Sequence, residues 1–410
     1  MRIFLYAFIS PLFLLISFSG LSSVTPCDAS AVFDLAWESR FQRTSGWTGG
    51  DGVQSVDLMD GRILFLFGDT WIGKIENNRR GKNDHLVRNS IAIFRNPPGK
   101  TGSMSFHWGN KGLSARPRAW IDPPGTQNRI PPKTPKADDV QTEWLWPLGD
   151  GVVVPSGASD RKLVLFFEKM CFDDRQKPPW NFRTAGSVLV VIEHAEEEIH
   201  KWKPVVVPIP FVSQTTKHSN GNRTASLSWG MALLPEIGER NAPSILYIYG
   251  IRQSPGSSND LVLAKAPLST PEDFGQWRFW TADGWKASPD DLQAIDTEMT
   301  NEFSVDPLPD PRSGLVLIQS DPFFQNDIWM RKADRPQGPF SPPIVVFSAS
   351  SLAGCNGCFA YAAKSHRILS EPHGWMISFV VNSTDFDELL TNTDIYRPRF
   401  IRLNLEQVLP

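Results

Sequence analysis

Five carboxylates recur at regular positions in the sequence. Asp51 and Asp69 are 18 residues apart, and Asp150 and Glu168 repeat that spacing of 18. Glu302 takes the place of the first acid in a later copy of the pattern. Crowded carboxylates raise one another's pKa values, so that one is protonated while another is ionised. Hydrolysis of a glycosidic bond needs such a pair, because one group protonates the leaving oxygen and the other activates water or attacks the sugar.

Hairpin pairing predicts that the acids of the first pair meet. Asp60-Gly61 is a strong signal for a two-residue turn, and such a turn makes paired positions sum to about 121. This register places Asp69 opposite Gly52 and beside Asp51. The two acids are therefore expected at one end of one hairpin.

A second predicted hairpin repeats this arrangement. The turn at Ser159-Asp160 brings Glu168 back beside Asp150. In the alternative interpretation, each Asp-Gly step only shapes a turn and Asp69 only caps a strand end. The recurrence favours the functional interpretation, in which the catalytic candidates are Asp51, Asp69, Asp150 and Glu302.

The strand pattern around these acids occurs five times. The innermost strands of the five units are predicted to begin at Asp51, Asp150, Trp229, Glu302 and Tyr361. Repeats of this size, with few helical stretches, predict short meanders in a radial array. The predicted fold class is all-β, a five-bladed β-propeller. A pair of β-sandwiches also has many short strands, but it explains the repeated spacing less well.

Residues 1–29 have the pattern of a cleaved signal peptide. A basic start is followed by an apolar core that ends near small residues. A retained membrane anchor is the alternative, although Pro11 and Gly20 interrupt the apolar stretch. Lipidation at Cys27 is a further alternative, although the residues before it are not the usual small ones. We expect residues 30–410 to form one propeller domain of a secreted or periplasmic protein, with no membrane contact after cleavage.

The amino-acid composition narrows the classes of molecule that the protein is expected to bind. The net charge of −3 provides no basic field for nucleic acid. The 15 Trp and 26 Phe suit β-structure and, where exposed, stacking on sugar faces. We therefore expect a monomer whose partner is a polysaccharide or oligosaccharide.

The four cysteines fit an exported protein with one or two disulfides. Cys355 and Cys358 are predicted to form a local disulfide across a tight Asn-Gly turn, with Cys171 free. A CxxC pair can also hold a metal or act in redox exchange, but no second CxxC or His pair accompanies it.

Several further side chains are suited to binding sugar. Amide, imidazole and carboxylate groups bond hydroxyls, and indole rings stack on sugar faces. For each aromatic residue alone, burial between blades is the simpler interpretation. The substrate-binding candidates are Trp47, Trp71, Asn89, Glu168, Trp229 and His366.

At these residues the sequence resembles secreted bacterial five-bladed propellers related to the endo-D-arabinanases, within the wider arabinanase and β-xylosidase type. The resemblance rests on residues 46–52 (GWTGGDG), 66–73 (LFGDTWIG), 88–90 (RNS) and 396–400 (YRPRF). It covers nearly the whole mature chain and many members have no known activity.

The resemblance implies roles for particular acids. Hydrolytic relatives imply that Asp51 and Asp69 are catalytic. The wider class takes a base, a pKa-modulating acid and a general acid from different blades, which implies Asp51, Asp150 and Glu302. The third unit departs from this pattern because it has Trp229 where an acid is expected.

Two functions follow from the sequence. The first is a secreted glycoside hydrolase that cleaves a furanoside-containing polysaccharide of the arabinan type, with inversion slightly favoured over retention. The second is a non-catalytic carbohydrate-binding propeller. No cofactor is required, and a cation such as calcium in the central channel is left open. The absence of a GxSxG sequence argues against a serine hydrolase.

Overall fold

The computed structural model describes residues 31–81, 84–96, 101–109, 116–124, 143–156, 160–173, 181–218, 221–238, 243–254, 257–371 and 374–408. The predicted signal peptide, Cys27 and Ser159 lie outside these residues. None of the helices in this described part is long and apolar enough to cross a membrane.

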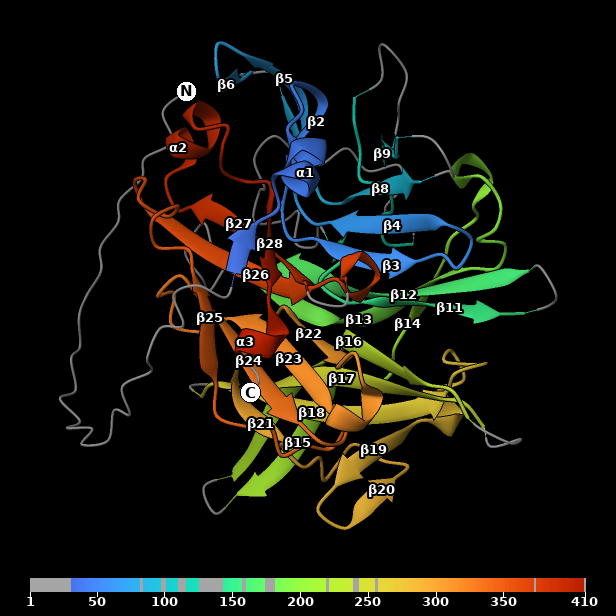
Figure 1. The fold of residues 1–410 in the computed structure, drawn as a ribbon. Coiled ribbons are helices and arrows are strands. Elements are labelled where there is room, and N and C mark those ends of the chain that lie inside the picture. Colours follow the sequence, from blue (N-terminus) through green and yellow to red (C-terminus); the bar gives the residue numbers. More distant parts are fainter. Residues whose placement is uncertain are drawn as a thin grey trace, which may run out of the picture.

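The described strands form five successive antiparallel sheets and one smaller sheet (Figure 1). The first sheet contains β3 (Gln54–Asp57), β4 (Arg62–Phe67), β8 (Ser90–Arg95) and β9 (Ser103–His107). The second contains β10 (Trp144–Trp146), β11 (Gly151–Pro155), β12 (Arg161–Phe172), β13 (Phe182–Ile192) and β14 (Val205–Pro208). The third contains β15 (Ser213–His218), β16 (Gly221–Glu236), β17 (Ile245–Gln253), β18 (Asn259–Pro267), β19 (Arg278–Thr281), β20 (Gly284–Lys286) and β21 (Asp296–Met299).

The fourth and fifth sheets complete the series. The fourth contains β22 (Phe303–Pro307), β23 (Leu315–Ser320), β24 (Asp327–Ala333) and β25 (Ile344–Ser348). The fifth contains β26 (Cys358–Ser365), β27 (Trp375–Ser383), β28 (Pro398–Leu403) and β1 (Ala31–Phe33). The smaller sheet contains β2 (Ser45–Gly50), β5 (Thr70–Glu76), β6 (Arg79–Arg80) and β7 (His85–Val87). The α-helices of the described residues are short: α1 (Leu35–Glu38), α2 (Phe386–Thr391) and α3 (Leu405–Val408).

The five sheets contact one another in cyclic order through their innermost strands. In this order β3 contacts β11, β11 contacts β16, β16 contacts β22, and β22 contacts β26. The fifth sheet returns to the first, because His366 Nδ1 shares a hydrogen bond of 2.8 Å with the Ser55 hydroxyl of β3. This cyclic order is the one that the predicted propeller requires.

A separate cluster of buried apolar residues fills each junction between neighbouring sheets. Between the first and second sheets, Val56 and Leu64 pack with Val153 and Leu165. Since these strands are covered on both faces, they have continuous apolar runs such as residues 64–67 instead of alternating ones. This burial on both faces explains why the strands have little polar alternation.

The registers of the two predicted hairpins differ from the expected ones. Gln54 pairs with Leu66, so paired positions sum to 120 in the first hairpin. The loop has three residues, 59–61, closed by a 3.0 Å bond from Leu58 N–H to the Arg62 carbonyl. Met59 and Gly61 have φ of +58° and +84°, which a three-residue turn accommodates.

In the second hairpin, Gly151 pairs with Leu165, and Glu168 pairs with Trp146 of β10. Glu168 therefore lies further along the strand than Asp150, not directly beside it. The sheet extends toward Glu168 because β10 adds a second partner to the long strand β12.

Cys355 and Cys358 form a disulfide with Cα atoms 5.3 Å apart, and Cys171 is a buried free thiol. If the signal peptide is removed at about residue 29, the mature chain keeps three of the four cysteines. Titration of the denatured secreted protein is then expected to find one thiol before reduction and three after it. Three thiols before reduction, or stoichiometric zinc, would contradict the disulfide, and N-terminal sequencing of the same sample checks the cleavage.

Candidate active site

The five repeat positions lie just before or within the innermost strands of the five sheets. Asp51 lies before β3, and Asp150 and Glu302 directly precede β11 and β22. Trp229 and Tyr361 lie at irregularities within β16 and β26. In three of these repeats the next residue has a left-handed backbone: Gly52, Gly230 and Ala362, at φ of +62°, +82° and +57°. This geometry marks three of the five predicted strand starts. The starts predicted at Trp229 and Tyr361 were wrong, because β16 begins at Gly221 and β26 at Cys358.

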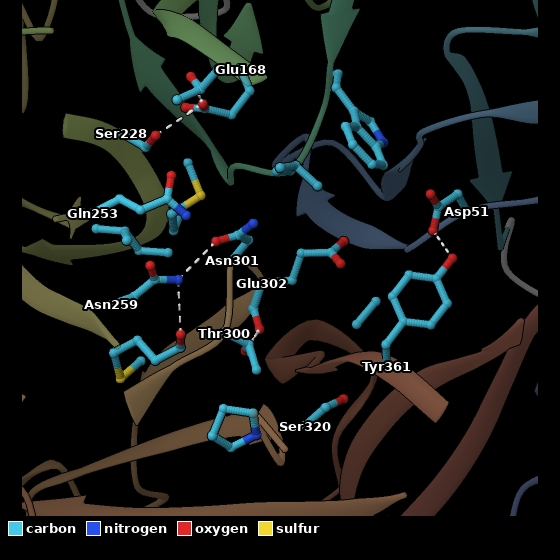
Figure 2. A pocket seen from close by; sticks show the side chains of 18 of the residues that line it. Asp51, Glu168, Ser228, Gln253, Asn259, Thr300, Asn301, Glu302, Ser320 and Tyr361 are labelled. Atoms are coloured by element: carbon cyan, nitrogen blue, oxygen red, sulfur yellow. Dashed lines mark hydrogen bonds between the residues drawn. The ribbon is translucent and has the colours of Figure 1, made fainter. Parts of the chain in front are cut away.

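Three of these positions, Asp51, Glu302 and Tyr361, line a cavity of about 510 Å³. Four carboxylates line it. Asp51 lies before β3 of the first sheet, Glu168 lies in β12 of the second, and Glu302 and Asp321 flank strands of the fourth. Tyr361 of the fifth sheet and Trp146 of β10 also line it. Figure 2 shows Asp51, Glu302 and Tyr361 on one side of this cavity and Glu168 on another. The described residues therefore form a pocket with several acids on different sheets.

Asp51 is only 6% exposed although it lines the cavity. The Tyr361 hydroxyl donates a hydrogen bond to Asp51 Oδ1 (Figure 2). The Asp51 backbone N–H donates to the Asp69 carbonyl at 2.9 Å, so these two acids lie directly across the hairpin. Burial raises the pKa of Asp51 well above its usual range, and the charges of Glu302 and Asp69 raise it further, while the bond from Tyr361 lowers it.

Glu302 projects into the same part of the cavity (Figure 2). Its Oε1 approaches the backbone of Gly52 so closely that a Cβ at position 52 would lie 2.9 Å from it. With its φ of +62°, position 52 therefore requires glycine for two reasons. Burial raises the pKa of Glu302 to about 7, and among the described residues only the positive charge of Lys364 lowers it.

Glu168 is held by three hydroxyl groups. Ser187 and Ser228 donate to its carboxylate at 2.7 and 2.9 Å, and Thr184 donates to it as well. Burial raises the pKa of Glu168 to about 7, and the three hydroxyl donors oppose that rise. This carboxylate is fixed in position while still lining the cavity.

Asp150 lies outside the cavity lining, among the inner strands. Its carboxylate accepts hydrogen bonds from Gln54 Nε2 at 2.7 Å and from the N–H groups of Gly151 and Leu233 at 2.7 and 3.2 Å. Burial raises its pKa to about 6, and these bonds and the charge of Lys364 oppose the rise. Asp150 thus connects the first three sheets.

Asp69 lies behind Asp51 and outside the cavity lining. Its Oδ2 pairs with Arg88 at 3.0 Å, and its Oδ1 is buried without a hydrogen-bond partner among the described residues. Burial raises the pKa of Asp69, and Arg88 lowers it. The Arg88 guanidinium also lies 4.3 Å from the centroid of the Trp144 ring.

Most of the other predicted binding residues are packed inside the protein and lie outside the cavity lining. Trp47 and Trp229 are fully buried, and Trp71 is 5% exposed. Asn89 Nδ2 donates to two backbone carbonyls, and His366 bonds two serine hydroxyls. Their observed contacts are therefore with the protein itself.

Several residues of the cavity lining were not among the predicted binding residues. Tyr361 occupies the repeat position in the fifth unit, which is the signal that marks it. Trp146 packs so closely on Gly68 that a Cβ at position 68 would come within 1.9 Å of the Trp146 Nε1. The glycine is the sequence feature that marks this contact. Gln253, Asn259 and Asn301 also line the cavity, and no repeat spacing marks them.

The sequence matches the family model described as "Domain of unknown function (DUF5005)" over residues 34–405. The chain belongs to this family. No curated protein matches the sequence. Among solved structures, the chain is similar to a candidate hydrolase from Bacteroides ovatus ATCC 8483, with 21% identity, a TM-score of 0.65, and coverage of 92% of this chain and 91% of that chain. This likeness shows a shared fold.

Two more distant structures are enzymes by their descriptions. One is a family 43 arabinoxylan arabinofuranohydrolase from Bacillus subtilis in complex with cellotetraose, with 11% identity, a TM-score of 0.44, and coverage of 86% of this chain and 63% of that chain. The other is an endo-arabinase from Bacteroides thetaiotaomicron VPI-5482, with 10% identity, a TM-score of 0.37, and coverage of 88% and 97%.

The raised pKa of Glu302 predicts a pH-dependent stability. Its pKa is about 7 in the folded chain against 4.5 for an ordinary Glu, so between these values the folded state binds more protons. The contribution of Glu302 to stability is present below about pH 4.5 and is lost as the pH rises through 7. The Tm of Glu302→Gln relative to wild type should therefore increase by a few degrees between pH 5 and pH 8. Glu76→Gln, on the exposed end of β5, is the control, and an equal shift in both variants would refute the assignment.

Proposed function

We propose that the protein is a secreted glycoside hydrolase with the fold of a five-bladed β-propeller, acting on a furanoside-containing polysaccharide of the arabinan type. The observation that carries the proposal is the pair Asp51 and Glu302, a buried and a half-buried carboxylate that line one cavity and repel each other. Such a pair retains a proton near neutral pH, which supplies an acid and a base together. The cavity volume of about 510 Å³ is also suitable for a small ligand.

The hydrogen bonds favour Glu302 as the acid and Asp51 as the base or nucleophile. The Tyr361 hydroxyl stabilises the ionised form of Asp51. Ionised Glu302 accepts no hydrogen bond within the described residues and is stabilised by the charge of Lys364 alone, so we assign the shared proton to Glu302. Glu302 then protonates the leaving glycosidic oxygen while Asp51 activates water or attacks the anomeric carbon. Tyr361 is a positioning residue for Asp51.

The remaining acids support this pair. We propose that Asp69 acts through Asp51 by raising its pKa. Glu168, held by three hydroxyls, is suited to accept hydrogen bonds from sugar hydroxyls in the cavity. Asp150 holds the inner strands in place through its bonds to Gln54 and Leu233.

The second candidate function is a carbohydrate-binding propeller without catalysis. The ion pair of Asp69 with Arg88 favours it, because a binding module is expected to have its acids in salt bridges. In the described part of the chain, Asp51 and Glu302 form no such ion pair, which favours catalysis. The net charge of −3 suits a neutral oligosaccharide or polysaccharide better than nucleic acid. The N-terminal pattern supports a secreted or periplasmic location.

We propose that no calcium ion is bound beside Glu302 and Asp150, because the Lys364 ammonium already lies near both carboxylates. The Lys364 side chain is 2% exposed, and its Nζ donates to the Leu148 carbonyl. Burial lowers the pKa of Lys364, whereas the nearby charges of Glu302 and Asp150 raise it. Among the described residues, the only cluster of three metal-ligating groups is Cys355, Cys358 and Glu388, away from these acids and including the disulfide. We propose that the Lys364 ammonium supplies the positive charge there.

This proposal predicts resistance to chelators. Incubation with EDTA should leave both Tm and activity unchanged, because the positive charge belongs to the chain. Lys364→Met should lower Tm, since it leaves Glu302 and Asp150 without their neighbouring cation. A Tm that falls with EDTA and recovers with calcium would show that the channel needs a metal.

Removal of either member of the Asp51–Glu302 pair should abolish most of the activity. Asp51→Asn and Glu302→Gln are each expected to lower kcat on arabinan by about 10²–10⁴-fold, because each removes a general acid or base. Tm should hold or rise, since both changes relieve repulsion between like charges. Asp69→Asn is expected to lower kcat as well.

Asp283→Asn, at an exposed turn of the third sheet, is the matched control and should behave as wild type. The measurement is hydrolysis of a panel of arabinans, xylans and galactans, with Tm recorded for every variant. Full activity in folded Asp51→Asn and Glu302→Gln proteins would leave the carbohydrate-binding function as the better interpretation.

A further inference from the structure

A row of aromatic rings leads from the proposed catalytic pair to the mouth of the cavity. The centroids of Tyr361 and Phe359 are 5.3 Å apart, and those of Phe359 and Phe324 are 5.4 Å apart with the rings at 89°. All three residues line the cavity. The row begins at Asp51, which accepts the Tyr361 hydroxyl, and ends at Phe324, which is 61% exposed. One wall of the cavity is therefore apolar from its base to the surface.

Phe324 adopts a backbone conformation that is unfavourable for an aromatic residue. Its φ is +58°, in the left-handed region, where a bulky side chain is an outlier. Such strain persists only where surrounding contacts impose it, and it concentrates at ligand-binding sites. The exposed Phe324 ring adds little to core packing, and its backbone conformation costs free energy. We therefore expect the ring to act at the surface.

The loop that carries Phe324 is fixed at both ends. Asp321 accepts hydrogen bonds from the N–H groups of Phe323 and Gln325, at 2.8 and 2.5 Å. Asn326 Oδ1 accepts the Ala360 N–H at 2.8 Å, which ties the loop to the fifth sheet. These hydrogen bonds fix the turn that carries the Phe324 ring. A fixed turn loses less conformational entropy when a ligand binds.

Amide side chains lie across the cavity from Tyr361 (Figure 2). Asn259 Nδ2 donates to the Met299 carbonyl and to Asn301 Oδ1, both at 3.0 Å (Figure 2). These bonds orient the two amides and leave the Asn301 nitrogen and the Asn259 oxygen for a ligand. Gln253 lies beside them (Figure 2). An aromatic face on one side and fixed amide groups on the other match a sugar ring, which has an apolar C–H face and a rim of hydroxyls.

We propose that Phe324 is the stacking platform of a sugar-binding subsite at the mouth of the cavity. The inference rests on the proposed function and deepens it. A sugar chain cut between Asp51 and Glu302 runs outward along the aromatic row, and a ring beyond the cleaved bond stacks on Phe324. The substrate is therefore a chain with sugar units beyond those at the bond, and Phe324 binds it without taking part in the chemistry.

The neighbouring residue provides a matched control. Phe323 is 56% exposed, but it lies outside the cavity lining and packs near Trp329, with ring centroids 6.1 Å apart. Both residues are exposed phenylalanines of one loop, and only Phe324 lines the cavity. A general effect of exposed apolar surface would appear in both variants, and a subsite effect only in one.

The test uses binding, so that it does not depend on turnover. In the Asp51→Asn background, isothermal titration calorimetry measures the affinity for linear arabino-oligosaccharides of increasing length, from the disaccharide upwards. Phe324→Ala should weaken binding of the longer chains by about tenfold and leave the disaccharide unaffected. Phe323→Ala should bind every length as the parent does, and Phe324→Trp should retain the affinity.

Phe324→Gly separates binding from folding. Glycine adopts φ of +58° without strain, so the Tm of this variant should hold or rise while affinity for long chains falls as in Phe324→Ala. A lowered Tm with unchanged affinity, or equal losses in Phe323→Ala and Phe324→Ala, overturns the subsite alone. A parent protein that binds no arabino-, xylo- or galacto-oligosaccharide of any length overturns the proposed function, and the subsite with it.

Discussion

The structure depends on the need of each sheet to cover two apolar faces. A strand that is buried on both sides has no solvated face, so the sheet requires a neighbour on each side. Five sheets in cyclic order satisfy this need with one apolar cluster at each junction. The innermost strands of the five sheets are then brought together near the centre. Residues as far apart in the sequence as Asp51 and Tyr361 become hydrogen-bonded partners for this reason.

This convergence places like charges in a buried space, which opposes folding. Asp51 and Glu302 each have a raised pKa because burial disfavours their ionised forms, and the charge of Glu302 raises the pKa of Asp51 further. Tyr361 and Lys364 offset part of this cost, one by a hydrogen bond and the other by its charge. Clustered groups with perturbed pKa values are characteristic of functional sites, because a stable core does not need them. The stability of the apolar junctions is what allows such a cluster to exist.

The sequence predicted those parts of the molecule that follow from periodicity. The spacing of the acids located the innermost strands and placed Asp51 and Glu302 at equivalent positions. It did not predict the register, because a three-residue loop at Met59 replaces the expected two-residue turn, and β10 extends the sheet beside Glu168. Sequence could not separate buried indoles from exposed ones, so Trp229 and Trp146 were indistinguishable by type. Asn301 and Phe324 lie in loops, where no period constrains the side chains.

The fifth sheet contains both ends of the described chain. Ala31, at the start of β1, pairs with Leu403 of β28, and Phe33 pairs with Ile401. During synthesis from the N-terminus, β1 emerges long before its partner exists. The fifth sheet therefore cannot be completed until residues 398–403 have been synthesised, and its completion joins the earliest described strand to one of the latest. Such a contact between distant segments makes folding slow.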